Sequence, residues 1–413
     1  MEPQIGVCVA ISYPLIYTFG FLALMESLYS VMGGIEYSRL LRKWINRCPG
    51  NFAPPATLIV PCRGIDPGLE ANLSAYFEQD YPDFQILLVT GERDDLCVDV
   101  LRQMQLKYPD TSAQILFAGK AENSGQKVHN LLHAVGHVRT QDEVFAFGDS
   151  DIRPSSLWLR YLVDPLQDEL VGISTGFRWY LSQRGNFASL LRSVWNAGSA
   201  SLMKDTDCYF AWGGAMAIRR ELFQICKIKD RWKNVLSDDF VISRAIHQHG
   251  LSIRFQPLCL SFSYEDCTLK QLWKWSVRQL SLTRIYHPSL WKKAVLSQVL
   301  FSSTLWGGSF LILWHLWNKT LAINGRHEVL ILTVVMIYGL SCVKGWIRLR
   351  SLLLLFPHHR RVLQKGLIAY VCWGPLASLV SLVGLFCSLC SRKIWWRGIL
   401  YKMISPDKTL VLK

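Results

Sequence analysis

Strongly apolar stretches lie at both ends of the chain and leave a mixed segment of about 215 residues between them, enough for one α/β core. The stretch from Ile5 to Tyr29 contains one charged residue, Glu26, and is long enough to cross a bilayer. Its first charge is Glu2 rather than a basic residue, so we expect a retained anchor and not a cleaved signal. Three further candidate spans lie at residues 294–316, 328–347 and 367–390.

Basic residues indicate the side of the membrane on which the central segment lies. They follow the first apolar stretch and separate the last two: Arg39, Arg42, Lys43 and Arg47, then Lys344, Arg348, Arg350, Arg360, Arg361 and Lys365. Because such loops stay in the cytosol, we expect an integral membrane protein with a cytosolic domain. Its compartment would be a bacterial inner membrane, or the ER or Golgi of a eukaryote. Four simple crossings would put the basic tail on the far side, but Trp373-Gly374-Pro375 interrupts the last stretch and leaves that crossing open.

The formal net charge is +14. Basic loops beside membrane spans explain much of it, and attraction to anionic lipid head groups is the functional interpretation, at about 1 kcal/mol per basic residue. The basic residues flank apolar stretches instead of forming a separate patch, so nucleic acid is not an expected partner. The pattern does not indicate an oligomeric state.

Short apolar runs alternate with helical patterns in the central segment. The strand-like runs are Ala56–Val60, Phe84–Thr90, Ala113–Ala118 and Val144–Gly148. Strands that alternate with helices predict a mostly parallel, Rossmann-like sheet. Ligands of such sheets bind beyond the carboxyl ends of the strands, where the polar clusters of this chain also fall.

Asp149-Ser150-Asp151 directly follows the last of these strands. Two carboxylates one residue apart at a strand end can face one cation, and their hard oxygens suit Mg²⁺ or Mn²⁺. Such a cation would neutralise the diphosphate of a nucleotide sugar. An Asp-x-Asp triplet is also common in solvated turns, and that alternative stays open.

Ser237-Asp238-Asp239 forms a second acidic cluster before an amphipathic helix. The structural interpretation is a helix N-cap with acidic residues favoured by the helix dipole. One carboxylate can also act as the base that takes the proton from an acceptor hydroxyl. The two interpretations are compatible.

Several motifs occur in the order and approximate spacing of a known enzyme group. They are Pro61-Cys62-Arg63-Gly64-Ile65-Asp66-Pro67, Asn72-Leu73, Gln79-Asp80-Tyr81-Pro82, Lys127-Val128-His129-Asn130-Leu131, Asp149–Asp151, Gly213–Arg220, Asp238-Asp239 and Ile394–Gly398 with Tyr401. The chain resembles ceramide glucosyltransferases and their bacterial relatives, in the family 2/21 group of glycosyltransferases with a GT-A fold. The resemblance covers nearly the whole chain.

The resemblance implies roles for individual residues. Asp239 would be the catalytic base, with Asp238 beside it, and Asp149 and Asp151 would hold the metal and diphosphate. Arg63, Glu92 and Lys127 would lie on the donor side, although Lys127 is also interpretable as a surface lysine. Trp212, Gly213 and Gly214 would form the floor toward the acceptor, or a purely structural turn.

One element of the family differs. A (Gln/Arg)-x-x-Arg-Trp motif is expected after the base, but this chain has Arg278-Gln279-Leu280-Ser281-Leu282-Thr283-Arg284. Arg278 or Arg284 would still supply a cation to the leaving diphosphate. The change weakens the expectation that the acceptor is ceramide and argues against a processive polymer synthase.

The expected organisation has four parts. These are an anchor with its basic segment (1–48), a GT-A domain (49–265), an amphipathic segment at the membrane interface (266–292) and a C-terminal membrane region with a basic tail (293–413). For residues 268–291, a helix packed on the catalytic domain is the alternative.

The expected function is inverting transfer of a hexose, with UDP-glucose as the leading donor, to a lipid hydroxyl such as that of ceramide. A polysaccharide synthase of the same fold is one alternative, but it would need more spans and an intact Arg-Trp motif. A non-catalytic membrane scaffold is another, although loss of Asp149, Asp151 or Asp239 would have favoured it.

Overall fold

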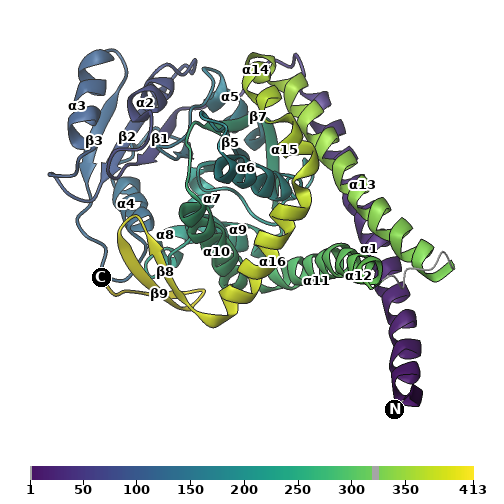
Figure 1. The fold of residues 1–413 in the computed structure, drawn as a ribbon. Helices are drawn as coiled ribbons and strands as arrows, with labels where there is room; N and C mark the ends of the chain where they lie inside the picture. The colour runs from purple at the N-terminus through teal and green to yellow at the C-terminus, as the bar shows by residue number, and fades with distance from the viewer. Residues whose placement is uncertain (1, 319–324) are drawn as a thin grey trace.

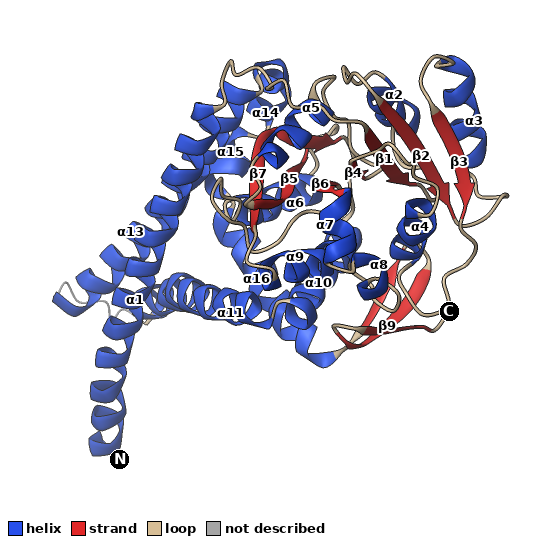
Figure 2. Cartoon of the chain, turned by 180° about the vertical axis from the view of Figure 1, so that it is seen from behind, coloured by secondary structure: helices blue, strands red, loops and turns tan. Residues whose placement is uncertain are grey.

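The computed structural model describes residues 2–318 and 325–413 (Figure 1). Its centre is a seven-stranded sheet of order β3-β2-β1-β4-β6-β5-β7 (Figure 2). The strands are Ala56–Pro61 (β1), Phe84–Thr90 (β2), Ala113–Phe117 (β3), Val144–Gly148 (β4), Val171–Tyr180 (β5), Ala215–Arg219 (β6) and Ser252–Ser263 (β7). Only β6 runs antiparallel to its neighbours, β4 and β5. The expected mostly parallel α/β domain is confirmed, with its first four strands where the sequence placed them.

Helices cover both faces of this sheet. They are Leu69–Phe77 (α2), Val98–Lys107 (α3), Gln126–Val135 (α4), Trp158–Val163 (α5), the 3₁₀ turn Asp164–Gln167 (η1), Phe187–Ala200 (α6), Arg220–Ile225 (α7), Ile228–Arg231 (α8) and Asp238–Gln248 (α9). Along β1, Ile59 belongs to a core with residues of α4, α6 and α9, while Leu58 and Val60 belong to one with residues of α2, α3 and α5. Because successive side chains of a strand point to opposite faces, a continuous apolar strand fills both cores.

Three helices are long and apolar enough to cross a membrane within the described residues. The first is Tyr17–Lys43, part of α1 (Glu2–Lys43). The second, Pro288–Trp317, combines α11 (Pro288–Ser302), a π turn (Ser303–Gly307, η2) and α12 (Gly308–Trp317). The third, His327–Leu355, lies in α13 (Gly325–Leu355), which runs beside α1 (Figure 1).

The fourth expected span is broken, as its Trp-Gly-Pro sequence indicated. After a 3₁₀ turn (Pro357–His359, η3) and α14 (Arg360–Lys365), α15 (Leu367–Cys372) ends just before Trp373, and α16 (Gly374–Cys390) begins. With 17 residues, α16 is shorter than the three candidate spans. If these three helices each cross the membrane, the C-terminal tail lies on the side of the catalytic domain, in agreement with the positive-inside rule.

The C-terminal residues, which we expected to be a basic tail, form a folded antiparallel sheet. Its strands are Lys393–Trp396 (β8), Ile399–Ser405 (β9) and Lys408–Val411 (β10). Tyr401 and Met403 are buried in the core of the catalytic domain. The Tyr401 hydroxyl accepts a hydrogen bond from Gln126 N at 3.2 Å, and Thr409 N donates to Asn234 O at 2.8 Å. The basic tail is thus folded onto the catalytic domain, because apolar side chains alternate along β9 and need a partner to bury them.

Residues 269–286 form α10 (Leu269–Tyr286), whose first turn is closed by a capping box from Thr268 and Gln271. The helix packs against α6, α11 and α16, and Leu272 and Leu280 are buried. Trp273 and Leu269 stay exposed. The packed face contacts the catalytic domain through α6 and the C-terminal helices through α11 and α16. Contact of the exposed face with the bilayer stays a prediction.

Candidate active site

The two acidic clusters and Lys127 line one cavity of about 1840 Å³. Asp149 and Asp151 follow the carboxyl end of β4, and Asp238 and Asp239 begin α9. Lys127 lies in the first turn of α4. Three elements distant in sequence therefore meet at the edge of the sheet where ligands of parallel sheets bind.

The Asp149–Asp151 loop is held from α2. The Tyr76 hydroxyl donates a hydrogen bond to Asp149 O at 2.9 Å, and Asn72 Nδ2 donates to Ser150 O at 3.1 Å. Ser150 Oγ donates to Asp66 Oδ2 at 2.8 Å. With the loop backbone and the middle side chain so occupied, both aspartate carboxylates face the cavity.

Lys127 connects the two acidic clusters. Its Nζ lies 2.9 Å from Asp149 Oδ1 and 3.1 Å from Asp238 Oδ2, and it donates to Gly213 O at 3.1 Å. Burial lowers the pKa of Lys127, but the Asp149 and Asp238 carboxylates outweigh this effect and hold the pKa above its ordinary value. Burial raises the pKa of Asp238 to about 6, against the opposing charge of Lys127. Because only 15% of the Lys127 side chain is exposed, Lys127 is not a surface lysine.

Asp239 has a different environment from Asp238. Its Oδ1 accepts from Phe240 N at 2.8 Å and from the Ser237 hydroxyl, and its Oδ2 accepts from Gly213 N at 3.3 Å. Ser237 also caps α9, as the sequence indicated. Asp238 is buried and paired with Lys127, whereas Asp239 is half-buried and has no ion pair among the described residues. Of the two carboxylates, Asp239 is thus the less buried one and the one without a cation partner among the described residues.

Glycine is needed at both positions of the Trp212-Gly213-Gly214 turn. A Cβ on Gly213 would collide with Asp238 Oδ2, and one on Gly214 would collide with the Trp212 ring. The second Cβ would also lie 2.5 Å from Asp149 Oδ2. The turn therefore lets the backbone approach both acidic clusters, and the Trp212 side chain lines the cavity.

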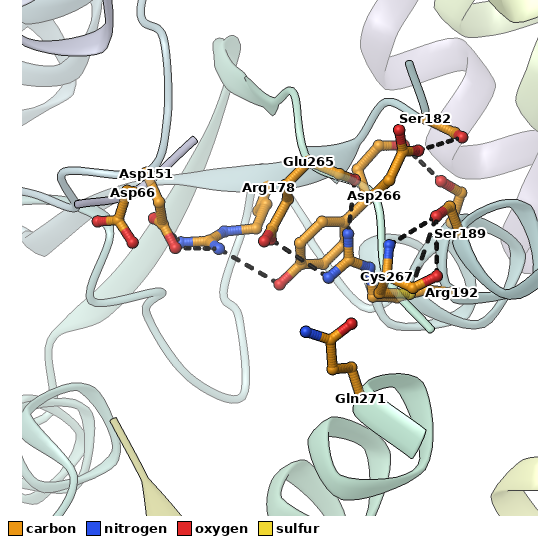
Figure 3. Close-up of polar contacts among 12 residues, drawn as sticks. Asp66, Asp151, Arg178, Ser182, Ser189, Arg192, Glu265, Asp266, Cys267 and Gln271 are labelled. Carbon is orange, nitrogen blue, oxygen red and sulfur yellow. Dashed lines mark hydrogen bonds and ion pairs between the residues drawn. The ribbon is translucent and has the colours of Figure 1, made fainter. Parts of the chain in front are cut away.

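Arg178, on β5, is a central residue of the site that sequence reasoning missed. One of its terminal nitrogens lies 2.8 Å from Asp149 Oδ2. The same nitrogen lies 2.6 Å from Asp151 Oδ1, and the other lies 2.9 Å from Asp151 Oδ2 (Figure 3). Burial raises the pKa of Asp151, but Arg178 and Arg397 outweigh this and hold it below its usual value. An arginine inside Val171–Tyr180, a strand buried along its whole length, was the available signal.

Arg397, in the C-terminal sheet, also reaches the site and was also missed. Its guanidinium lies 2.9 Å from Asp66 Oδ1 and 3.7 Å from Asp151 Oδ2. Arg397 and Gly398 form the two-residue turn between β8 and β9, with φ of 46° and 80°. Positive φ at both positions is typical of a tight hairpin. The turn that ends β8 thus directs a cation at the Asp-x-Asp motif.

The remaining predicted residues divide into two groups. Arg63 and Arg278 line the cavity, and the Arg278 guanidinium lies over the Trp396 ring at 5.3 Å. Burial lowers the pKa of Arg278 to about 10. Within the described residues, Glu92 and Arg284 are outside the cavity lining. Glu92 pairs with Lys120 at 3.0 Å, and Arg284 donates to Leu389 O at 3.2 Å near the end of α16.

The donor set of Asp149 and Asp151 suits a hard divalent cation, and both carboxylates already converge on one positive charge. One Arg178 nitrogen contacts both carboxylates and stands where such an ion would bind. Within the described residues, no group of three or more His, Cys, Asp and Glu side chains is arranged so that it could hold a metal ion. The two aspartates therefore fit Mg²⁺ or Mn²⁺ only when the Arg178 guanidinium moves away from them.

The comparisons with known proteins agree with the expected family. The model of glycosyl transferase family 21 matches residues 21–409. A ceramide glucosyltransferase 1 of Caenorhabditis elegans is 20% identical over 246 residues, which are 59% of this chain and 50% of that protein. A ceramide glucosyltransferase of Komagataella phaffii is 33% identical over 119 residues, 28% of this chain and 23% of that protein. The matches thus span half or less of these relatives' lengths.

Among solved structures, a mannosyltransferase from Pyrobaculum calidifontis in complex with GDP-mannose and Mn²⁺ matches with a TM-score of 0.46. It is 16% identical and covers 90% of this chain and 98% of its own. The family match covers the acidic clusters, the membrane helices and most of the C-terminal sheet, and it extends far beyond half of the chain. The chain belongs to glycosyl transferase family 21.

Proposed function

We propose that this chain transfers a hexose from a nucleotide sugar to a hydroxyl of a membrane lipid, with inversion at the anomeric carbon. The observation that carries the proposal is the continuity of the cavity. It is lined by Asp149 and Asp239 at one end and by Ser297 and Ser378 of the apolar helices at the other. A lipid can then present its hydroxyl to the acidic clusters without leaving the membrane region.

On the donor side, cations surround the position proposed for the diphosphate. Lys127, Arg178 and Arg397 bring positive charge to Asp149 and Asp151, and Arg63 and Arg278 line the same cavity. Preorganised cations stabilise the negative charge that develops on a leaving diphosphate. A divalent ion held by Asp149 and Asp151 would supply further neutralisation of that leaving group.

On the acceptor side, Asp239 takes the proton from the lipid hydroxyl as its oxygen attacks the anomeric carbon. The C–O bond to the diphosphate breaks as the new C–O bond forms, and attack from the opposite face inverts the configuration. Gly213 N–H fixes the carboxylate from one side and the start of α9 from the other. Preorganisation of this kind lets a carboxylate act as a general base without first rearranging.

The proposed sugar is glucose and ceramide is one proposed acceptor, as the names of the relatives suggest. We propose UDP-glucose as the nucleotide sugar that supplies this glucose. The proposed orientation places the catalytic domain in the cytosol, because basic residues lie at the C-terminal end of α1 and from the second half of α13 to the end of α14. A polysaccharide synthase is the less favoured alternative. Within the described residues only three helices qualify as spans, and Arg-Trp is missing after the base.

The test is a transfer assay with purified full-length protein in detergent. Radiolabelled UDP-glucose, UDP-galactose and GDP-mannose are each incubated with the protein and either ceramide or diacylglycerol. The lipid products are separated by thin-layer chromatography and their masses are measured by mass spectrometry. We expect one lipid to gain one hexose, and we expect Asp149→Ala to remove the product. A ladder of hexose additions, or label in water-soluble polymer alone, would contradict the proposal.

A further inference from the structure

The membrane end of the cavity contains two cations that form no ion pair among the described residues. Lys344 and Arg348 lie one turn apart on α13, and both line the cavity. Lys344 Nζ donates to Ser30 Oγ at 2.7 Å, and Arg348 Nε donates to Ser201 Oγ at 2.7 Å. Among the ion pairs of residues 2–318 and 325–413, neither cation has a carboxylate partner.

A third hydrogen-bond donor lies beside them on α1. Tyr37 lines the cavity and is 3% exposed, and its hydroxyl has no hydrogen-bond partner in the described part of the chain. It is close enough to Arg348 for the two to interact electrostatically. Because α1 and α13 run side by side, these three side chains form one cluster from two helices (Figure 1).

Cations in a membrane-facing environment are costly unless an anion compensates them. A serine hydroxyl accepts a hydrogen bond but carries no charge. The Glu26 carboxylate, which also lines the cavity, is close enough to Lys344 to interact electrostatically, but within the described residues it forms no ion pair and accepts from Ser297 Oγ instead, so the cluster keeps a net positive charge. Ser201 is the C-cap of α6, and the carbonyl end of a helix favours a nearby cation. The end of α6 therefore compensates part of the charge of Arg348. It does not explain Lys344 or the unpaired hydroxyl of Tyr37.

We propose that Tyr37, Lys344 and Arg348 bind the phosphate of a membrane lipid. The two cations lie toward the end of the α13 span that meets the catalytic domain, as the bond from Arg348 to Ser201 indicates. Lipid phosphates lie at that level of a bilayer. The lipid is either the acceptor itself or a neighbouring bilayer lipid. Only the first of these two possibilities rests on the proposed function.

Binding of lipid to the full-length protein in a non-ionic detergent tests the site without any transfer reaction. The probes are phosphatidylglycerol and diacylglycerol with the same acyl chains, measured by native mass spectrometry. We expect phosphatidylglycerol to bind more tightly, and we expect Lys344→Gln and Arg348→Gln each to weaken it about fivefold. Arg350→Gln is the matched control, because Arg350 is exposed on the same helix and outside the cavity lining.

Tyr37→Phe keeps the packing of the ring and tests the third donor if either charge variant fails to fold. Equal binding of the two lipids, unchanged binding in both charge variants, or an equal loss in Arg350→Gln would overturn the proposal.

A transfer assay with labelled UDP-glucose then distinguishes whether the bound lipid is the acceptor or a neighbouring bilayer lipid. Sugar on phosphatidylglycerol, with a KM raised by Lys344→Gln for this lipid alone, identifies the acceptor. Faster transfer to diacylglycerol when phosphatidylglycerol is present identifies a neighbouring lipid. Binding of phosphatidylglycerol without any transfer would overturn the proposed function and leave the anion site intact.

Discussion

Lys127, Arg178 and Arg397 at the donor end of the cavity each have two carboxylate partners, whereas Lys344 and Arg348 at the membrane end have serine hydroxyls as their partners among the described residues. Both ends are largely removed from water, so the cost of desolvation is similar in kind. The donor end compensates its charges internally and must rearrange to admit a diphosphate. The membrane end keeps its positive charge for an anion that arrives from outside.

The largest effect is expected for Asp239→Asn, in the acidic cluster at the start of α9. Without the carboxylate, the acceptor hydroxyl has no base, so we expect kcat to fall about a thousandfold while UDP still binds. Transfer of labelled sugar gives the first quantity and calorimetry the second. Asp230→Asn, at an exposed carboxylate paired with Lys233, is the control. Turnover above about a tenth of wild type would move the base to Asp238.

Next in size is the loss of stability on Lys127→Met. The change leaves Asp149 and Asp238 without a shared cation in a buried site, so we expect the free energy of unfolding to fall by about 3 kcal/mol. Lys120→Met is the matched control, because Lys120 also pairs with a carboxylate, Glu92, but its side chain is 77% exposed. For that variant we expect a change below about 1 kcal/mol. Denaturation in detergent measures both, and similar losses would show that the donor end is not specially dependent on internal compensation.

Arg178→Gln tests whether the donor end must rearrange before a divalent cation binds. Since Arg178 contacts both aspartates, we expect its removal to tighten Mn²⁺ binding in the absence of nucleotide about tenfold. Electron paramagnetic resonance of free Mn²⁺ reports this without any turnover. Arg192→Gln is the control, since Arg192 lies over the Tyr180 ring as Arg178 does but pairs with Glu265 at 3.3 Å (Figure 3). Unchanged or weaker Mn²⁺ binding in Arg178→Gln would mean that the guanidinium does not compete with the ion.

The smallest effect is expected for Ser378→Ala at the membrane end. Ser378 Oγ lies 3.0 Å from Ser302 Oγ and also donates a hydrogen bond to Gln298 Oε1. All three side chains are uncharged, so the change leaves no unpaired charge behind. Hydrogen bonds between membrane helices contribute about 0.6 kcal/mol on average, and we expect a loss of that order in stability. Thermal unfolding in detergent measures it. A loss as large as that of Lys127→Met would erase the energetic distinction between the two ends.

The sequence by itself determined the features that depend on neighbouring residues. Mostly apolar runs indicated the first four strands, and three of these, β1, β2 and β4, are central strands buried on both faces. The positions of Asp149 and Asp151 after β4, and the cap at Ser237 before Asp239, followed from the same local patterns. The break at Trp373 was also visible locally, since a glycine and a proline follow it.

Only the tertiary structure decided which distant residues meet at the donor end. No local motif marked Arg178, and Arg397 lay in the expected basic tail, but the sheet and the C-terminal hairpin bring both to Asp151. Conversely, Arg284 matched the chemistry of the site but lies against the end of α16. The joining of both ends into one cavity depends on the packing of α1, α11, α13 and α16 on the catalytic domain. A local pattern specifies the hydrophobicity and the turn of a segment, whereas the partner of a charge depends on contacts across hundreds of residues, which no local pattern encodes.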